Sequence, residues 1–419
     1  MPQEYITILE NRRIALGVTG SIAAYKAVDL ASKLTQAGSM VDVIMTEAAT
    51  RFVSPLTFES VTGRSAYVDL WQSAGRDLPT HIAHIGLGHQ ADLMIVAPAT
   101  ANTLAKLATG MADNLLTVTA LAVHGPVVVA PAMDGGMYEN PATQANLQTL
   151  RSRGMIVIDP DEGHLASGMT GIGRLPDTFR LMGEIRRALG ATGELAGRHI
   201  VITAGGTREP LDPVRYLSNR STGKQGYALA QAALDVGASV TLITTPTALR
   251  PPVGANVVSV TTAVEMRDAV LAHVDRADAL IMAAAVADFR PATPSEQKIK
   301  KSANPDESTT LPLVRNPDIL LEVKEHARKT GWPRVTVGFA AESQDLIDYA
   351  RSKLENKGLD LIVANDITAT DSGFGSDYNR VLILDRKGGH QWLELATKAK
   401  IGETIIARVA DVLLGSSPA

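Results

Sequence analysis

The chain has 419 residues, of which 45% are hydrophobic and 20% charged, an ordinary globular composition that excludes disordered, collagen-like and coiled-coil chains. A formal net charge of −4 gives no electrostatic reason to expect nucleic acid or an anionic membrane as a partner, so small molecules are the expected ligands. The sequence contains no cysteine, which excludes disulfides, thiolate metal sites and a cysteine nucleophile.

Two stretches bear on targeting and membranes. Residues 1–13 carry charges and no apolar core, so we expect no signal peptide and a cytoplasmic protein. Residues 114–133 form an uncharged run about as long as a membrane span, but His124-Gly125-Pro126 divides it into a helical piece and a strand. We therefore expect this run to lie in a buried core.

Apolar runs alternate with amphipathic stretches along the chain, which is typical of parallel sheets covered by helices. We expect an α/β fold with two Rossmann-like three-layer domains, each a mostly parallel sheet with helices on both faces. Glycines near residues 190–194 predict the boundary between domains 1–190 and 195–419. Residues 291–310 are polar and lack periodicity, which predicts a flexible, lysine-rich flap in the second domain.

The predicted elements follow in chain order. In the first half we expect strands at 14–18, 41–45, 93–97, 127–130 and 156–158, with helices at 22–36 and 143–153. In the second half we expect strands at 199–203, 239–244, 279–283, 335–339 and 359–364, with a closing helix at 401–414.

The first strand-to-helix connection, residues 17–23, reads G-x-x-G-x-x-A. Small residues at such a turn let backbone N–H groups and a helix N-terminus approach a phosphate, although a purely structural turn has the same composition. The spacing differs from the G-x-G-x-x-G of nicotinamide-binding folds, and the second strand ends in Thr46 where a ribose-binding acid is expected. Glu47 keeps a nicotinamide dehydrogenase open as an alternative.

A second connection, residues 97–103, lies between a predicted strand and a helix. Its Thr100, Asn102 and Thr103 can cap that helix and donate to a phosphate, although capping alone also explains them. Together with residues 18–26 (VTGSIAAYK), residues 97–106 resemble the flavin-dependent cysteine decarboxylase family, in which both loops hold the phosphate of FMN. The resemblance implies FMN contacts by Gly20, Ser21, Thr46, Thr100, Ala101, Asn102 and Thr103.

Three further segments match this family in order: His84-Ile85-Gly86-Leu87, residues 131–138 (PAMDGGMY) and residues 163–174 (GHLASGMTGIGR). The resemblance implies that His84 is the active-site histidine and that position 134 holds the substrate carboxylate. It also implies that position 167 is the acid that protonates the enethiolate intermediate.

This sequence departs from the usual family pattern at two of these positions. Asp134 stands where asparagine is usual, and Ser167 stands where a proton-donating cysteine is usual. A serine hydroxyl is a far weaker acid than a thiol, so Ser167 needs help from a neighbour. We hypothesise a paired exchange in which an Asp134 carboxyl buried beside the flavin supplies the proton. The alternative is a decarboxylase half that has lost its reduction step.

The second half opens with residues 204–215 and 219–226, which place glycines, hydroxyls and two cations, Arg215 and Lys224, in one strand-to-helix connection. An anionic, phosphate-bearing ligand at a helix N-terminus needs this combination, whereas a structural turn would not need both cations. The Gly-Lys pair lacks the spacing of a Walker loop.

Further polar segments follow at residues 283–291 (AAAVADFRP), 298–301 (KIKK), 316–319 (NPDI) and 338–342 (GFAAE). A lysine triplet is most often a solvated face, but it also suits a lid over a nucleotide triphosphate. The set resembles phosphopantothenate-cysteine ligase, and the two halves in this order resemble the fused bacterial decarboxylase/ligase of coenzyme A synthesis. The resemblance implies CTP contacts by Asp288, Lys298, Asn316, Pro317, Phe339, Lys353 and Lys357, with Asn219 and Arg215 serving the acyl-cytidylate step.

The resemblance also implies the reactions and the assembly. Cysteine would be ligated to 4′-phosphopantothenate with CTP and Mg²⁺, and FMN-dependent decarboxylation would then give phosphopantetheine. A homo-oligomer with trimers of the flavin domain linked by ligase-domain dimers is expected. The sequence does not identify metal ligands. The competing function is a ligase whose N-terminal half serves only as an oligomerisation or regulatory module.

Overall fold

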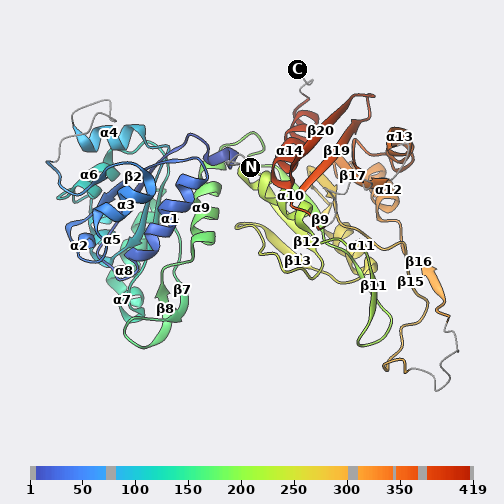
Figure 1. Cartoon of the computed structure of the whole chain (residues 1–419), viewed down its shortest axis with the longest axis horizontal. Coiled ribbons are helices and arrows are strands. Elements are labelled where there is room, and N and C mark those ends of the chain that lie inside the picture. The colour runs from blue at the N-terminus through green and yellow to red at the C-terminus, as the bar shows by residue number, and fades with distance from the viewer. Residues whose placement is uncertain (1–5, 72–81, 301–309, 343–345, 367–374, 416–419) are drawn as a thin grey trace. The chain divides into compact units, whose positions relative to one another are not determined.

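The computed structural model describes residues 6–71, 82–300, 310–342, 346–366 and 375–415. The chain divides into two compact units, residues 1–190 and 191–419, and each is built around a mostly parallel sheet with helices on both faces (Figure 1). The predicted fold class is therefore confirmed.

The sheet of the first unit has six parallel strands in the order β3-β2-β1-β4-β5-β6. Its strands are β1 (Arg13–Val18), β2 (Met40–Met45), β3 (Ala66–Tyr67), β4 (Leu93–Ala99), β5 (Val127–Pro131) and β6 (Ile156–Val157). The helices are α1 (Ala24–Gln36), α2 (Glu47–Thr50), α3 (Pro55–Thr62), α4 (Ala83–Gln90), α5 (Ala101–Thr109), α6 (Leu115–Ala122), α7 (Gly135–Glu139), α8 (Pro141–Ser152) and α9 (Thr178–Gly190), with a 3₁₀ turn at Thr7–Leu9. An antiparallel hairpin, β7 (Asp161–His164) and β8 (Thr170–Arg174), lies beside α7 at one end of this unit (Figure 1).

Neighbouring residues of the central strands face two separate cores. Ile14 and Leu16 of β1 belong to a cluster with side chains from α1, α3 and α9, whereas Ala15 belongs to the cluster formed with α4, α5, α6 and α8. A strand covered on both faces reads as a continuous apolar run, which is why the sequence predicts these strands well. The uncharged run at 114–133 contains α6 and β5 and contributes to these cores, as expected.

The second unit contains an eight-stranded sheet in the order β13-β12-β9-β14-β17-β18-β19-β20, of which β19 and β20 are antiparallel. Its strands are β9 (His199–Ala204), β12 (Ser239–Thr244), β13 (Asn256–Ser259), β14 (Ala279–Met282), β17 (Val335–Glu342), β18 (Leu361–Asp366), β19 (Tyr378–Asp385) and β20 (His390–Thr397). The helices are α10 (Lys224–Asp235), α11 (Ala263–His273), α12 (Ile319–Thr330), α13 (Leu346–Lys357) and α14 (Lys398–Leu414). Two small hairpins join β10 (Arg208–Pro210) to β11 (Tyr216–Ser218) and β15 (Phe289–Pro291) to β16 (Leu313–Arg315).

Several predicted boundaries are wrong. Helix α1 begins at Ala24 rather than at residue 22, because the preceding residues form the turn after β1. Helix α14 begins at Lys398 rather than at residue 401, because the Thr397 side chain accepts a hydrogen bond from Lys400 N and caps it. The strand predicted at 359–364 is Leu361–Asp366, since Asp360 instead accepts the Thr336 N–H with its side chain.

The predicted flap at 291–310 lies between β15 and β16, and residues 301–309, which include Lys301, are outside the described part of the chain. Among the described residues, no helix combines the length and the apolar character needed to cross a membrane.

Candidate active sites

In the first unit, a cavity of about 590 Å³ opens where β1, β4 and β5 end. This volume lies within the usual range of small-molecule sites. Its walls come from the β1–α1 connection, the start of α5, the turn before α7 and the β7–β8 hairpin. Of the predicted site residues, the cavity brings together Gly20, Ser21, Thr100, Ala101, Asp134 and Ser167.

The two predicted phosphate loops meet at this cavity. A Cβ atom on Gly20 would lie 2.5 Å from the Cβ of Ala48, so the loop after β1 can take this close path only with glycine. Thr100 caps α5, because its hydroxyl accepts a 3.4 Å hydrogen bond from Thr103 N. The first turn of α5 thus presents backbone N–H groups beside the glycine turn.

A residue without a predicted role, Thr19, joins these loops. Its buried hydroxyl donates to Pro98 O at 2.6 Å and accepts from Thr100 N at 3.0 Å. The side chain therefore ties the β1–α1 turn to the β4–α5 turn across the sheet. The only sequence signal is a hydroxyl residue directly after an apolar strand, which does not reveal the partner.

Asp134 and Ser167 come from separate segments and contact each other directly. Ser167 Oγ donates to Asp134 Oδ2 at 2.7 Å, while Asp134 Oδ1 accepts from Gly136 N at 3.1 Å and caps α7. Ser167 is exposed and Asp134 is partly exposed. The structure therefore brings together the predicted pair of Asp134 and Ser167, but within the described part of a single chain Asp134 is not buried as predicted.

The turn that carries Asp134 is held against the β7–β8 hairpin. Gly173 has φ +137°, and a Cβ atom there would lie 2.1 Å from Met133 O. Met133 N donates to Gly173 O at 3.0 Å. This close approach requires glycine and fixes the hairpin that presents Ser167.

Two cations, Lys26 and Arg174, also line the cavity. Lys26 Nζ donates to Leu175 O at 2.9 Å, and burial, with a smaller effect from the Arg174 charge, lowers the pKa of Lys26. Positive charge at this wall favours an anionic substrate.

The remaining predicted residues of this unit do not line the cavity. His84 lies on α4, which is at the other end of the unit from α7 and the β7–β8 hairpin (Figure 1). Thr46 caps α2 by accepting from Ala49 N, Asn102 is exposed in the first turn of α5, and Thr103 is buried.

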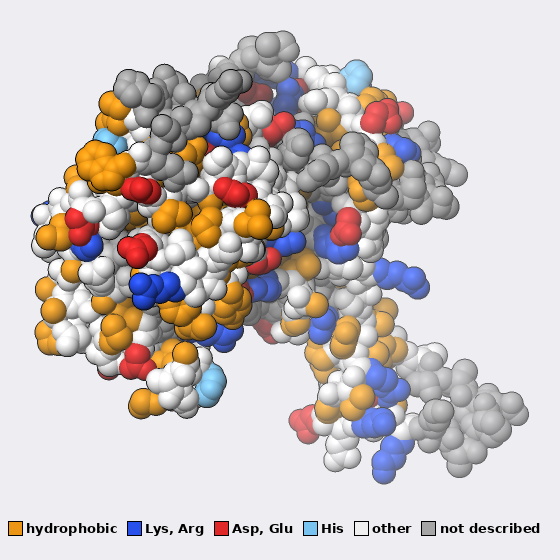
Figure 2. Space-filling view, turned by 60° about the vertical axis from the view of Figure 1, so that its left-hand side comes forward, with side chains coloured by type: hydrophobic (Ala, Val, Ile, Leu, Met, Phe, Trp, Pro, Cys, Tyr) orange, Lys and Arg blue, Asp and Glu red, His pale blue; other side chains and the backbone are white. Residues whose placement is uncertain are grey.

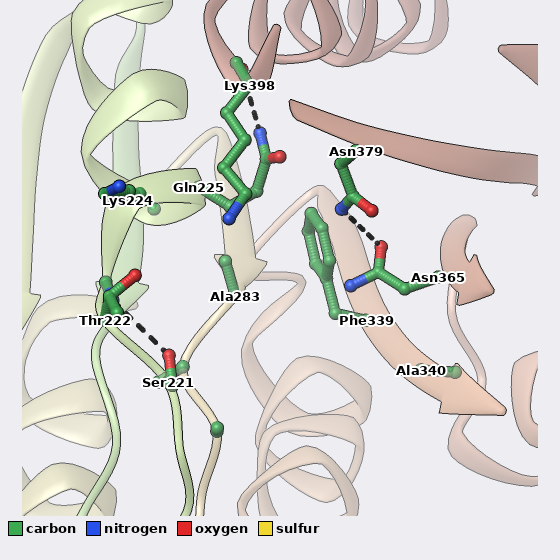
Figure 3. A pocket seen from close by; sticks show the side chains of 14 residues that line it. Ser221, Thr222, Lys224, Gln225, Ala283, Phe339, Ala340, Asn365, Asn379 and Lys398 are labelled. Atoms are coloured by element: carbon green, nitrogen blue, oxygen red, sulfur yellow. Dashed lines mark hydrogen bonds between the residues drawn. The ribbon is translucent and has the colours of Figure 1, made fainter. Parts of the chain in front are cut away.

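The second unit contains a smaller cavity of about 120 Å³ at the N-terminus of α10 (Figure 3). It is lined by residues 221–226, residues 283–285, Phe339, Ala340, Asn365, Asn379 and Lys398. The segments 219–226, 283–291 and 338–342 singled out from the sequence supply most of this wall, and of the predicted CTP contacts Phe339 lies in it. Lys398, Asn365 and Asn379 had no predicted role.

Buried threonines shape the loop after β14. Thr203 Oγ1 accepts from Ala284 N at 3.1 Å, and Thr207 Oγ1 accepts from Ala287 N at 3.0 Å. Asn219 Nδ2 lies 3.3 Å from the carbonyl oxygens of Ala285 and Val286 in the same loop. The predicted catalytic amide therefore lies beside the cavity.

Arg215 lies at the base of the predicted flap. Its guanidinium contacts the buried Asp212 at 2.6 Å and donates to Ile299 O at 2.9 Å, while Ile299 N donates to Asp212 at 3.1 Å. The Arg215 hydrogen bond holds the pKa of Asp212 well below its ordinary value. Figure 2 shows Lys and Arg side chains gathered on the projecting segment that carries β15 and β16, and Lys298 in this segment is exposed.

The other predicted CTP contacts surround the carboxyl ends of β14 and β17. Asn316 N donates to Asp288 O at 2.8 Å, and Pro317 follows at the start of α12. Lys353 Nζ donates to Phe339 O at 3.3 Å, and Lys357 forms an ion pair with Asp318. Within the part of the chain that the structure describes, no cluster of three metal-ligating side chains is found.

The fold and the two cavities define a two-unit α/β protein with a cavity at the strand ends of each unit. A family model described as "Flavoprotein" matches residues 3–190, and one described as "DNA/pantothenate metabolism flavoprotein C-terminal domain" matches residues 195–413.

Full-length relatives show the particular family. The chain is 47% identical over 406 residues to the coenzyme A biosynthesis bifunctional protein CoaBC of Bacillus subtilis (strain 168), which covers 96% of this chain and 98% of that protein. It is 43% identical over 401 residues to the CoaBC protein of Escherichia coli (strain K12), covering 96% and 97%. The chain belongs to this family of coenzyme A biosynthesis bifunctional proteins. A crystal structure of the C-terminal domain of a CoaBC protein, at 36% identity and a TM-score of 0.45, covers 53% of this chain and 99% of that one.

Proposed function

We propose that the chain catalyses two consecutive steps of coenzyme A biosynthesis. The first is the CTP- and Mg²⁺-dependent ligation of cysteine to 4′-phosphopantothenate through an acyl-cytidylate, and the second is the FMN-dependent decarboxylation of phosphopantothenoylcysteine to phosphopantetheine. Family membership across both units carries the proposal, and each unit has a cavity at its strand ends. A cytoplasmic location is part of this proposal.

In the ligase unit, the phosphopantothenate carboxylate attacks the α-phosphate of CTP and pyrophosphate leaves. The cysteine amine then attacks the mixed anhydride, and CMP leaves. Asn219 hydrogen-bonds the anhydride, because an amide can donate and accept, while Arg215 and Lys298 neutralise phosphate charge. The CTP contacts are Asp288, Lys298, Asn316, Pro317, Phe339, Lys353 and Lys357. Mg²⁺ is held mainly through the nucleotide phosphates.

The first cavity fits FMN by two observations. The turn at Gly20, which passes close to Ala48, lines the cavity, and the capped first turn of α5 at Thr100 and Ala101 presents N–H groups of the kind that bind phosphate. Bound FMN would supply a reversible electron acceptor, which oxidises the substrate thiol before CO₂ is lost and serves as the reductant afterwards. The loops joined by Thr19 hold its phosphate, and the wall with Lys26 and Arg174 holds the anionic substrate.

The Asp134–Ser167 pair supplies the last proton in place of cysteine. In this relay Ser167 Oγ passes its proton to the substrate carbon, and the carboxyl of Asp134, once it has taken up a proton, passes that proton on to Ser167 Oγ. The charge then ends on a carboxylate rather than on an alkoxide, which removes the main objection to serine as an acid. The 2.7 Å contact between the two side chains supports this relay.

We infer that a second copy of the chain completes the decarboxylase site with His84, since His84 does not line the cavity of its own chain. This suits trimers of the first unit, linked by dimers of the second. A His84→Asn chain and a Ser167→Ala chain, each inactive alone, should regain decarboxylation when co-assembled. No gain on co-assembly would place a complete site within one chain.

The decisive experiment is product analysis of the purified chain with phosphopantothenate, cysteine, CTP and Mg²⁺ by mass spectrometry. Accumulation of phosphopantetheine supports both activities. Accumulation of phosphopantothenoylcysteine or of an oxidised enethiol supports the competing function, a ligase whose first unit does not turn over substrate. That function is favoured by Ser167, which stands where the family usually has cysteine.

A further inference from the structure

The cavity of the second unit has a positively charged wall. Two of its lining residues, Lys224 and Lys398, are cations, and none of the described lining residues is Asp or Glu. Lys398 is only 6% exposed, although lysine is among the residues least often buried. A buried ammonium group in the wall of a cavity can bind an anionic ligand there.

Lys398 is held by hydrogen bonds of its backbone and of its side-chain ammonium group. Its backbone oxygen accepts from Gln225 Nε2 at 3.2 Å, which ties the start of α14 to α10, and its Nζ donates to Ser376 O at 2.6 Å. In Figure 3 the side chain extends from α14 toward Ala283, across the N-terminus of α10. The ammonium group is therefore positioned at the cavity before any ligand arrives.

The N-terminus of α10 offers further groups to a phosphoryl ligand. Helix α10 begins after Gly223, which has φ +82°, and a Cβ atom on Gly226 would lie 2.5 Å from the Cβ of Ala204. The N-terminal N–H groups of this twelve-residue helix lie at the cavity. Gln225 Oε1 is buried without a hydrogen-bond partner among the described residues, so the wall also has an acceptor for a protonated phosphate or a ribose hydroxyl.

We propose that Lys398 is a substrate-binding residue of the ligase reaction and contacts a phosphoryl group in this cavity. The inference rests on the proposed ligase function and adds a residue from the last helix of the chain to that site. The phosphoryl group belongs either to CTP and its pyrophosphate product or to phosphopantothenate.

The charge of Lys398 is adjustable by pH. Burial, and secondarily the Lys224 charge, lower the pKa of Lys398 to about 8, while Asp377 acts in the opposite direction. Asp377 forms a 2.6 Å ion pair with Lys224, and Glu403 on the same helix pairs with the exposed Lys400. Anion binding should therefore weaken as the pH rises above about 8, because Lys398 then loses its proton.

Titration calorimetry with the full chain tests the site without turnover, with inorganic pyrophosphate and phosphate as probes. Lys398→Met should weaken anion binding by about tenfold or more, because it removes a charge-assisted hydrogen bond. Lys400→Met, on the same helix, is the matched control and should bind as the wild type does. Wild-type affinity should fall about tenfold per pH unit above pH 8, and Lys398→Arg should bind without this fall.

Steady-state kinetics then separate the two sources. A raised KM for CTP with weaker pyrophosphate inhibition assigns the site to the nucleotide, and a raised KM for phosphopantothenate alone assigns it to the acyl substrate. A folded Lys398→Met chain with wild-type anion affinity and both KM values unchanged overturns the proposal. If that variant does not fold, a wild-type affinity that stays constant between about pH 7 and pH 9.5 overturns it. Anion binding by a chain without ligase turnover would refute the ligase function and leave the site standing.

Discussion

The exchange of Asp134 for asparagine tests the decarboxylase chemistry most directly. Asparagine caps helices as well as aspartate does, so Asp134→Asn keeps the acceptor for Gly136 N and should leave α7 intact. The variant loses the ionisable carboxyl next to Ser167. General acid catalysis contributes about 10² to 10⁴ in rate, so we expect single-turnover formation of phosphopantetheine to slow by about 100-fold or more.

The assay is rapid quenching with phosphopantothenoylcysteine, followed by mass spectrometry of phosphopantetheine and of the oxidised enethiol. The visible flavin spectrum of each variant shows whether the cofactor is still bound. Asn140→Asp is the matched control, because Asn140 caps α8 through Ala142 N and does not line the cavity. The control should keep the wild-type rate.

A second substitution sharpens the result. Adding Ser167→Cys to Asp134→Asn restores the residue types usual in the family and should recover much of the lost rate, because a thiol is a stronger acid than a hydroxyl. If Asp134→Asn alone turns over as fast as the wild type, the carboxyl of Asp134 is only a helix cap and the relay is refuted. If both variants stop at the enethiol with flavin bound, the proton comes from another group.

Three further predictions follow from packing and charge. Gly20→Ala should abolish flavin binding, measured by visible absorbance, because its Cβ would lie 2.5 Å from the Cβ of Ala48; retained flavin would show that the loop moves freely. Thr19→Val should lower the free energy of unfolding by about 1 to 3 kcal/mol in urea, since it leaves buried groups of the β4–α5 connection without their partner. The Asp212–Arg215 pair contributes its full stability above the ordinary carboxyl pKa of 3.8, and this contribution is lost as the pH falls below that value. Asp212→Asn should therefore make the free energy of unfolding in urea depend less steeply on pH in this acid range. A variant with the same pH dependence as the wild type would contradict this prediction.

The sequence predicts the centre of each sheet better than its edges. Central parallel strands such as β1 and β9 are covered on both faces and read as apolar runs. Strand β20 is mostly exposed, and its sequence HQWLELAT lacks such a run, so it was missed. The β7–β8 hairpin and β13 were missed for the same reason, since their burial is partial.

The candidate sites were predicted through their loops rather than through their long-range contacts. Motifs at strand ends point to Gly20 and Thr100, because small and capping residues carry a local signal, whereas the role of Asn219 was predicted from the family resemblance. Lys398 carries no such signal: it lies in the last helix and becomes part of the second cavity only when α14 packs against α10. The contact of Ser167 with Asp134 likewise depends on how the β7–β8 hairpin folds back.

In both units, buried threonines join the loops that leave neighbouring strands of the sheet. In each unit the chain leaves the first strand toward one edge of the sheet and later returns to its other side. Strand β1 therefore lies between β2 and β4, and β9 lies between β12 and β14. The backbone groups of the loops that separate at this point need partners, and threonines provide them: Thr19 bonds the loop after β4, and Thr203 and Thr207 bond the loop after β14. A hydroxyl can donate and accept in one short side chain. Residues next to these hydrogen bonds, Gly20 and Thr100 in the first unit and Ala284 in the second, line the two cavities, so the threonines tie together the loops that form the cavity walls.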